Sequence, residues 1–167
     1  MAVEGTVVIP NPVMRHEIAD YLKVGETFEL MGLGFESLNE SPNAQSSSKT
    51  YINQKSQSSF VKSYQREFPY SADMIKSEKA NMALYNVNRH NATGADAMFE
   101  YVRVDLYDPD TATNSFKARQ FTVSVEVSSV EGNGGDNLVH SGTLKAFGDP
   151  VEGTFNTQTK TFTKASE

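Results

Sequence analysis

Residues Phe116 to Thr163 read FKARQFTVSVEVSSVEGNGGDNLVHSGTLKAFGDPVEGTFNTQTKTFT. Apolar and polar side chains alternate over the first part of this stretch. The apolar set is Phe121, Val123, Val125 and Val127, and the intervening polar set is Gln120, Thr122, Ser124 and Glu126. This period of two is typical of an antiparallel strand with one buried face. We therefore expect the apolar set to face a core and the polar set to face away from it.

Further strands are predicted on both sides of this segment. The glycines of Gly132–Gly135 permit the positive φ angles of a turn between strands. Ser141–Phe147 and Thr154–Thr163 supply two or three strands after that turn. Upstream, Phe99–Tyr107 alternates in the same way, and Asp108-Pro109-Asp110 is typical of the turn that ends such a strand. The second half of the chain therefore predicts an antiparallel sheet.

The first half carries weaker strand signals. Strands are predicted at Thr27–Phe35, Thr50–Gln54 and Ser58–Phe68. Between the first two lies Glu36–Lys49, which contains a proline and a run of Gln and Ser residues. We expect this segment to be a long polar loop, and a loop of this length in a compact domain is usually either disordered or functional.

The N-terminal residues Met1–Lys23 have mixed character. Pro10 and Pro12 favour an extended or turn backbone, because the residue before a proline is pushed out of helical geometry. Met14–Leu22 fits a short helix, and an N-terminal arm lying on a neighbouring molecule fits equally well. The sequence leaves both interpretations open.

One helix is predicted, from Ser71 to about Val87. Ser71 has the side chain of an N-cap, and Asp73 would complement the helix dipole in the first turn. The predicted apolar face consists of Met74, Ile75, Met82 and Tyr85. We expect this face to pack on a sheet. Glu78 falls within it, either as a snorkelling edge residue or as a contact to another subunit.

Together these elements predict a mainly β (α+β) fold. It is an antiparallel β-barrel or sandwich with one flanking α-helix at about 71–87 and a long polar loop at about 36–49. At 167 residues the chain is long enough for one domain and short for two. Residues 1–167 are therefore expected to form a single domain, with 1–23 as a candidate N-terminal arm.

Charge and composition narrow the classes of function. The net charge of −6 argues against a protein that grips nucleic acid, because phosphate binding needs clustered Lys and Arg. The absence of cysteine removes disulfides, thiol catalysis and thiolate metal sites. No basic and apolar signal segment opens the sequence, and no apolar run is long enough to suggest a membrane span.

The sequence shows no arrangement of catalytic, cofactor-binding or metal-ligating residues. His16, His90 and His140 are not spaced as zinc ligands and are expected to face solvent or to bond locally. Asp108-Pro109-Asp110 begins like a calcium loop but lacks its glycine and its distal glutamate. The glycine-rich Glu131–Asp136 lacks the lysine and the following helix of a phosphate-binding loop, and Gly-x-Ser-x-Gly is missing. We therefore predict a protein with no catalytic residues, no cofactor and no metal site.

Several segments resemble the tail tube (major tail) protein of long-tailed bacteriophages and of related phage-tail-like particles. They are MGLGFESLNESPNAQSSSKTYINQKSQSSFVKSY (Met31–Tyr64), FPYSADMIKSEKA (Phe68–Ala80), GADAMFEYVRVDLY (Gly94–Tyr107), FKARQFTVSVEVSSVEGNGG (Phe116–Gly135) and GDPVEGTFNTQTKTFT (Gly148–Thr163). The resemblance covers most of the chain from about Met14 onward. Its motifs are structural rather than catalytic.

The resemblance implies a β-barrel or sandwich with a flanking helix, which closes into hexameric rings that stack into a hollow tube. Such a tube conducts a genome out of a virion or is driven into a target cell. The implied partners are further copies of the chain, tail terminator, baseplate or tape-measure proteins, and in some tails a sheath. The implied location is the virion tail or a phage-tail-like particle, after synthesis in the cytoplasm of the bacterial host.

Two hypotheses concern the assembly itself. Because exposed strand edges and polar loops can pair with a neighbour, we expect Glu36–Ser59 to form a ring-to-ring contact, helped by the N-terminal arm. Duplex DNA carries about one negative charge per 1.7 Å, so we expect acidic residues to outnumber basic ones on lumen-facing strands and to leave DNA mobile without specific binding. The polar set of residues 120–126 is the candidate for lumen or neighbour contact.

A second class of function shares the strand pattern and the lack of catalytic motifs. A carbohydrate- or surface-binding β-sandwich module would present exposed aromatic residues as a platform. The chain has no tryptophan, but its tyrosines could take that role.

Overall fold

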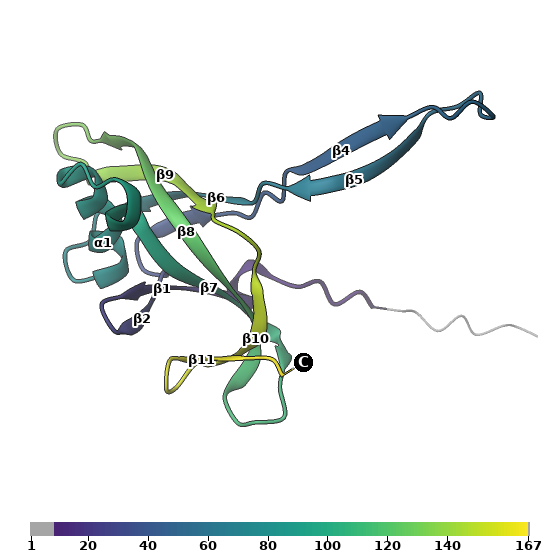
Figure 1. The fold of residues 1–167 in the computed structure, drawn as a ribbon. Coiled ribbons are helices and arrows are strands. Elements are labelled where there is room, and N and C mark those ends of the chain that lie inside the picture. Colours follow the sequence, from purple (N-terminus) through teal and green to yellow (C-terminus); the bar gives the residue numbers. More distant parts are fainter. Residues whose placement is uncertain (1–8, 167) are drawn as a thin grey trace, which may run out of the picture.

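The computed structural model describes residues 9–166, and these form a curled antiparallel β-sheet with one α-helix packed against it (Figure 1). The strands are β1 (Ile18–Val24), β2 (Thr27–Leu30), β3 (Phe35–Leu38), β4 (Ala44–Lys49), β5 (Ser58–Tyr64), β6 (Glu67–Asp73), β7 (Met98–Pro109), β8 (Ser115–Glu131), β9 (Val139–Ala146), β10 (Val151–Asn156) and β11 (Thr161–Lys164). The helix is α1 (Lys79–Arg89), and two short 3₁₀ turns are η1 (Arg15–Glu17) and η2 (Gly94–Ala97). The predicted mainly β fold with a single helix is confirmed.

The long strand β8 organises the main sheet. The strands run in the order β2-β1-β7-β8-β9-β6-β3, and β8 is 17 residues long. Strand β7 pairs along one edge of β8, whereas β9 and β10 share the other edge, at residues 123–131 and 115–120 respectively. Strand β11 adds to β10. Strands β4 and β5 form a separate two-stranded sheet.

The alternation of β8 faces the core as predicted. The first three residues of its apolar set are buried in the main core, and Val127 packs at the edge of that core. The rings of Phe68 and Tyr101 pack on Phe121, with centroid separations of 4.9 and 6.0 Å. Burial of these aromatic groups supplies much of the apolar surface that stabilises the sheet.

Strand β7 is buried on both faces, which its alternation did not reveal. Tyr101 faces the main core, whereas Val102 and Val104 face a second core with Phe28 of β2 and Phe155 of β10. Because the sheet curls, β2 and β10 cover the face of β7 that would otherwise meet solvent (Figure 1). The polar parity predicted for this strand is therefore partly wrong.

The helix begins at Lys79, so the predicted start at Ser71 is wrong. Ser71 lies in β6 and pairs with Ser141 of β9. Its backbone is therefore part of the sheet, and a helix cannot begin there. The predicted apolar face is wrong as well, since Met74 and Ile75 precede the helix. The buried face consists instead of Ala80, Asn81, Leu84 and Val87, and Glu78 stands at the N-cap position.

Two further predictions in the first third need correction. Met14–Leu22 is not an α-helix: after η1 the chain enters β1, which is held between β2 and β7. The predicted strand Thr27–Phe35 breaks into β2 and β3 at a turn in which Gly34 has φ of +89°. A side chain there would also collide with Ile75 and with the backbone oxygen of Asp73.

Part of the segment predicted as a candidate N-terminal arm, residues 1–23, belongs to the main sheet. Residues 9–14 are exposed and have no regular secondary structure, whereas residues 18–23 belong to the main sheet. Residues 1–8 lie outside the described part of the chain. Among residues 9–166, no helix has the length and apolar character needed to cross a membrane.

Candidate functional site

The segment predicted as the loop Glu36–Lys49 is not a loop. Its start is β3 in the main sheet, and its end is β4, which pairs with β5 from Ala44↔Tyr64 to Lys49↔Ser58. The predicted strand Thr50–Gln54 is instead part of the turn between them. We call residues 44–64 the hairpin. It projects away from the rest of the molecule as a ribbon with no layer on either face (Figure 1).

The hairpin exposes a set of large apolar side chains. These are Tyr51, Ile52, Phe60, Val61 and Tyr64. Ile52 is fully exposed at the tip, and the others are about half exposed. Two-stranded hairpins are marginally stable by themselves in water, and clustered exposed apolar groups usually mark a contact surface. A contact was predicted in this segment from the polarity of its sequence, and these apolar residues were not predicted to form its surface.

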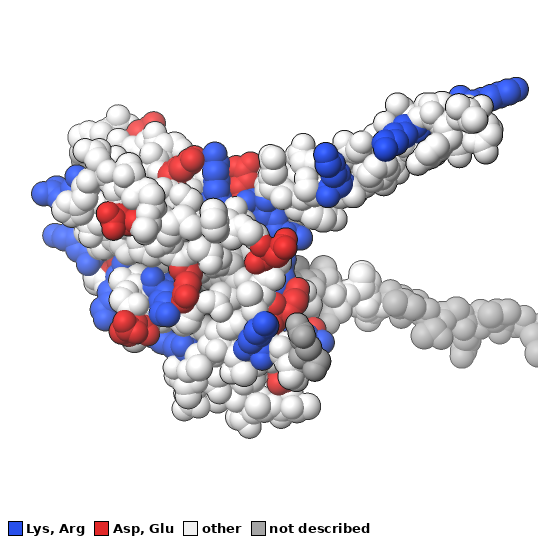
Figure 2. Space-filling view, in the orientation of Figure 1, with Lys and Arg blue, Asp and Glu red and all other residues white. Residues whose placement is uncertain are grey.

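The hairpin is also electrostatically distinct from the rest of the molecule. It contains Lys49, Lys55 and Lys62, and the sequence from 41 to 66 has no acidic residue. The whole chain nevertheless has a net charge of −6, so the remaining residues are markedly acidic. Figure 2 shows this separation, with basic and no acidic atoms along the hairpin. A charge difference of this kind favours contact between the basic hairpin and an acidic surface of another molecule.

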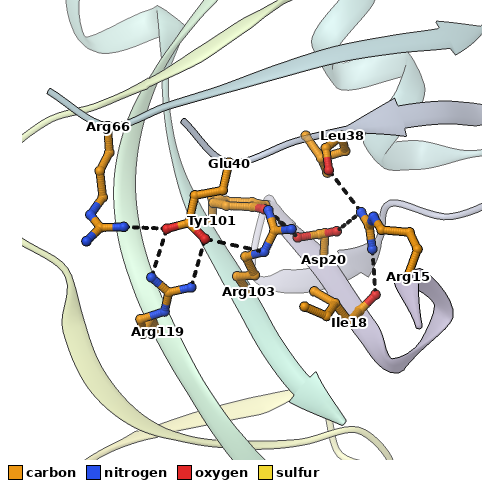
Figure 3. A network of polar contacts seen from close by, with 9 residues as sticks. All are labelled: Arg15, Ile18, Asp20, Leu38, Glu40, Arg66, Tyr101, Arg103 and Arg119. Carbon is orange, nitrogen blue, oxygen red and sulfur yellow. Dashed lines mark hydrogen bonds and ion pairs between the residues drawn. The ribbon is translucent and has the colours of Figure 1, made fainter. Parts of the chain in front are cut away.

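The root of the hairpin is fixed by a carboxylate among three arginines (Figure 3). Glu40, which precedes β4, accepts two hydrogen bonds from Arg119 of β8, at 2.9 and 3.0 Å. It also accepts one from Arg66, which follows β5. Arg103 lies 3.8 Å from the same carboxylate. Since Glu40 and Arg66 flank the two strands, their pairing closes the base of the hairpin against the main sheet.

Burial alone would raise the pKa of Glu40. The hydrogen bonds from Arg119 and the positive charges of Arg119, Arg103 and Arg66 outweigh that effect and hold the pKa below its ordinary value. Glu40 therefore stays ionised at neutral pH. In return, its hydrogen bonds raise the pKa of Arg119 further above its ordinary value.

A second carboxylate continues the cluster toward the N-terminus. Asp20 of β1 pairs with Arg15 at 2.6 Å and accepts a hydrogen bond from Tyr101. Arg103 lies between the two carboxylates, with Nη1 3.7 Å from Asp20. Arg15 also donates to the backbone oxygens of Ile18 and Leu38, at 2.8 and 3.1 Å. Asp20, Tyr101 and Arg103 are buried and Arg15 is about half exposed, so the cluster runs from the surface at η1 through β1 and β7 to the root of the hairpin.

Asn43 and Ser41 add further hydrogen bonds at the same root. Asn43 adopts φ of +46°, a left-handed conformation that asparagine tolerates, and its Nδ2 donates to Gln65 O at 3.0 Å and to Glu67 Oε1 at 2.7 Å. Ser41 forms an isolated bridge with Glu67. These bonds set the direction in which the hairpin leaves the sheet.

A mainly apolar groove lies near the N-terminal side of this cluster. Its volume is about 890 Å³. The residues that matter for its character are Met14, Leu30, Met31, Phe35, Glu36 and Leu106. Leu30 is 47% exposed, so the groove is open to solvent at β2. Arg15 and Asp20 line the groove as well, which places its wall directly against the polar cluster.

The three histidines do not come together as a site. His16 and His90 are exposed, whereas His140 is buried beneath α1. Its Nε2 lies 2.9 Å from Asn81 Oδ1, and its Nδ1 lies 3.4 Å from the hydroxyl of Tyr70. Burial lowers the pKa of His140, so its neutral form is favoured. The expectation of solvent-facing or locally bonded histidines is confirmed, with His140 as the local case.

The other sequence motifs have structural places. Asp108-Pro109-Asp110 stands at the end of β7, where Asp108 pairs with Lys117 at 3.3 Å. The glycine-rich Glu131–Asp136 connects β8 to β9, as predicted for a hairpin turn. Within residues 9–166, no group of three His, Asp or Glu side chains could hold a metal ion.

Sequence reasoning missed the polar root altogether. Glu40 and Arg119 lie 79 residues apart, and Asp20 and Tyr101 lie 81 apart, so no local spacing links them. Arg103 gives no signal either, because it falls on the polar positions of an alternating strand.

The fold has relatives among solved structures. The chain is similar to one in the tail of an empty gene transfer agent (GTA) particle determined by helical refinement with C6 symmetry, with a TM-score of 0.56 and 10% identity over 83% of this chain and 97% of that one. It is also similar to a chain of the anti-feeding prophage (AFP) baseplate, six-fold symmetrised, with a TM-score of 0.53 and 8% identity over 86% and 97%. No family model and no curated protein sequence matches. The chain therefore has a phage-tail-like protein fold, which confirms the resemblance at the level of the fold.

Proposed function

We propose that this chain is a structural subunit of a phage tail or phage-tail-like particle, and that it forms the tube: hexameric rings that stack into a hollow conduit. The observation that carries the proposal is the hairpin, a ribbon rooted in the sheet by the Glu40–Arg119 pair, with apolar side chains that the described part of the chain leaves exposed. The similarity to chains of two assemblies with C6 or six-fold symmetry supports it.

The geometry suits repeated self-assembly. A contact between two different surfaces of identical copies produces a ring if the rotation closes and a filament if it does not. A tube needs one contact of each kind. In this proposal the hairpin makes the ring-to-ring contact, and the edges of the curled sheet at β2 and β3 contribute to the contact within the ring.

The remaining parts of the proposal follow from the same role. The chain acts as a single domain without catalysis, located in a virion tail or similar particle, and it meets terminator, baseplate or tape-measure proteins at the ends of the tube. DNA passes through the lumen without specific binding, because acidic residues outnumber basic ones on the lumen-facing strands. Residues 120–126 of β8, with Thr122 and Glu126 exposed, remain the candidate strand for the lumen or for a neighbouring subunit.

Negative-stain electron microscopy of the purified full-length chain tests the proposal. Rings or hollow tubes with a central channel are expected. A chain that remains monomeric at high concentration and binds glycans would support a carbohydrate-binding module instead.

The role of the hairpin is tested by deleting Ser41–Ser48, which removes most of β4 and the Asn43 contacts at the root. We expect the deletion to prevent tube growth while single rings still form. Tubes of normal length would contradict the proposed ring-to-ring contact.

A further inference from the structure

Among residues 9–166, nothing covers the tip of the hairpin. Tyr51 and Ile52 lie in the turn between β4 and β5, and Ile52 is fully exposed. Lys49 and Lys55 flank this apolar pair. The hairpin points away from the body of the molecule, so its tip stands clear of the main sheet (Figure 1).

The groove between the N-terminal segment and strands β1 to β3 has the matching character. Its apolar surface includes Leu30, Met31 and Phe35, and Leu30 is open to solvent. Glu36 lines it and is exposed, and Glu17 lies between two residues that line it. Glu36 is thus an exposed carboxylate beside an apolar floor, and it shares the lining with the exposed Arg15 and His16. The body of the molecule outside the hairpin is acidic overall, because the chain has a net charge of −6 and the hairpin itself is basic.

We propose that the groove of one copy receives the hairpin tip of a second copy, with Ile52 and Tyr51 against the apolar floor and the flanking lysines toward Glu36 and the acidic body. The inference rests on the proposed assembly and names the surface that receives the hairpin. The apolar tip matches the apolar groove, and the basic hairpin matches the acidic body. Both features favour a second copy as the partner, because every copy carries one tip and one groove.

The polar cluster makes this contact repeatable. Glu40 holds the hairpin root, Asp20 and Arg15 line the groove, and Arg103 lies between the two carboxylates. The direction of the hairpin is thus fixed relative to the groove of the same copy. A fixed relation between the two halves of a heterologous contact is what gives every successive copy the same rotation and translation.

Cysteine cross-linking tests the contact directly, because the natural chain contains no cysteine. We would introduce Ile52→Cys and Leu30→Cys together in the full-length chain and oxidise the assembled protein. Covalent multimers on non-reducing gels are expected, since each copy would join both its neighbours. The control pairs Ile52→Cys with Leu138→Cys, which replaces an exposed residue next to β9 outside the groove, and should give none.

Two further variants use the asymmetry of the contact. Ile52→Glu removes a working tip but leaves the groove, and Leu30→Glu removes a working groove but leaves the tip. Alone, each should abolish assemblies longer than one ring. When rings of the two variants are mixed in equal amounts, they should form pairs of rings but no tubes. The tip of Leu30→Glu can still enter the groove of Ile52→Glu, whereas the reverse contact cannot form. Leu138→Glu should assemble like the natural chain.

The outcomes separate this inference from the proposed function. If the natural chain forms tubes but no cross-link appears and both Glu variants polymerise, the groove is not the receptor and the tube proposal stands. If the natural chain forms no rings or tubes, both proposals fall. If Ile52→Glu leaves tube length unchanged but lowers binding to duplex DNA or to anionic vesicles, the tip serves that partner and the inference is overturned. Should Leu30→Glu fail to fold by circular dichroism, the cross-link at the milder Leu30→Cys still decides.

Discussion

Arg119 donates two hydrogen bonds to Glu40, one to each carboxylate oxygen, at 2.9 and 3.0 Å. This bidentate pair connects the central strand β8 to the residue from which the hairpin departs. The planar fork of the guanidinium matches the two carboxylate oxygens, and such a bidentate pair is stronger and more directional than a single ion pair. A projecting ribbon with little burial of its own therefore takes its orientation from the centre of the sheet.

Removing the charge of Glu40 should loosen the hairpin root. In Glu40→Gln, three arginines lose their shared carboxylate, and hydrogen bonds to charged groups contribute about 1.5–3 kcal/mol each. We expect a loss of free energy of unfolding in that range, together with faster amide exchange in residues 41–66. Denaturant unfolding and hydrogen-exchange mass spectrometry measure the two effects. Glu126→Gln is the control: its ion pair with Lys145 is exposed, so its change should stay within about 0.5 kcal/mol.

The same carboxylate predicts a dependence on acid pH. The pKa of folded Glu40 lies below its ordinary value of 4.5, so the ionised form stabilises the folded state. That contribution is complete above about pH 4.5 and is lost as pH falls through the lower folded value. The stability difference between the natural chain and Glu40→Gln should therefore narrow below pH 4.5. A difference that stays constant down to the acid transition would contradict the proposed charge cluster.

How far the sequence predicts this molecule depends on the range of the interactions involved. The strands β7 to β11 and the core face of β8 follow from alternation, which is local to each strand. The helix start failed because the pairing of Ser71 with Ser141 is a contact across 70 residues, which overrides a local capping signal. The root of the hairpin was missed for the same reason.

The predicted strand Ser58–Phe68 contains β5, whereas the first strand of the hairpin, β4, was missed for a different reason. Neither face of its ribbon is buried, so its residues need no alternation of apolar and polar types. Its Ser-rich first strand therefore looks like a loop, although its backbone is fully paired with β5. A hydrophobic pattern cannot report a strand that has neither face buried in its own fold.

A second pH effect should arise at His140. Burial lowers its folded pKa below the ordinary value of 6.5, so protons bind the unfolded chain preferentially. Stability should therefore fall as pH drops below about 6.5 toward the lower folded value, a window that begins at higher pH than that of Glu40. Chemical unfolding at several pH values between 7.5 and 5.0 measures this slope. His140→Gln should flatten it, whereas replacing the exposed His90 with Gln should leave it unchanged.

Gly142 should tolerate no side chain. It lies in β9 opposite Val127, where the register of the ladder shifts, and a Cβ would come within 2.0 Å of the backbone oxygen of Glu126. Because backbone cannot give way as a flexible side chain can, Gly142→Ala should destabilise the fold by at least about 1–3 kcal/mol. Gly134→Ala, in the open turn after β8, meets nothing within 4 Å and should change the unfolding midpoint little. Equal effects of the two substitutions would disprove the close approach.

Assembly through the hairpin should depend on its charge and on salt. Lys49 and Lys55 flank the apolar tip in a segment without acidic residues, on a chain whose net charge is −6. Reversing both to glutamate should repel the acidic body of a neighbour and shorten or abolish tubes, whereas Lys76→Glu, an exposed lysine ahead of α1, should not. Exposed charges are screened over about 10 Å at 0.1 M salt and about 3 Å at 1 M. Tube length measured by electron microscopy and sedimentation should therefore fall between 0.05 and 1 M sodium chloride. Length that is unaffected by salt, together with normal growth of the doubly reversed variant, would mean that apolar burial at Tyr51 and Ile52 holds the contact alone.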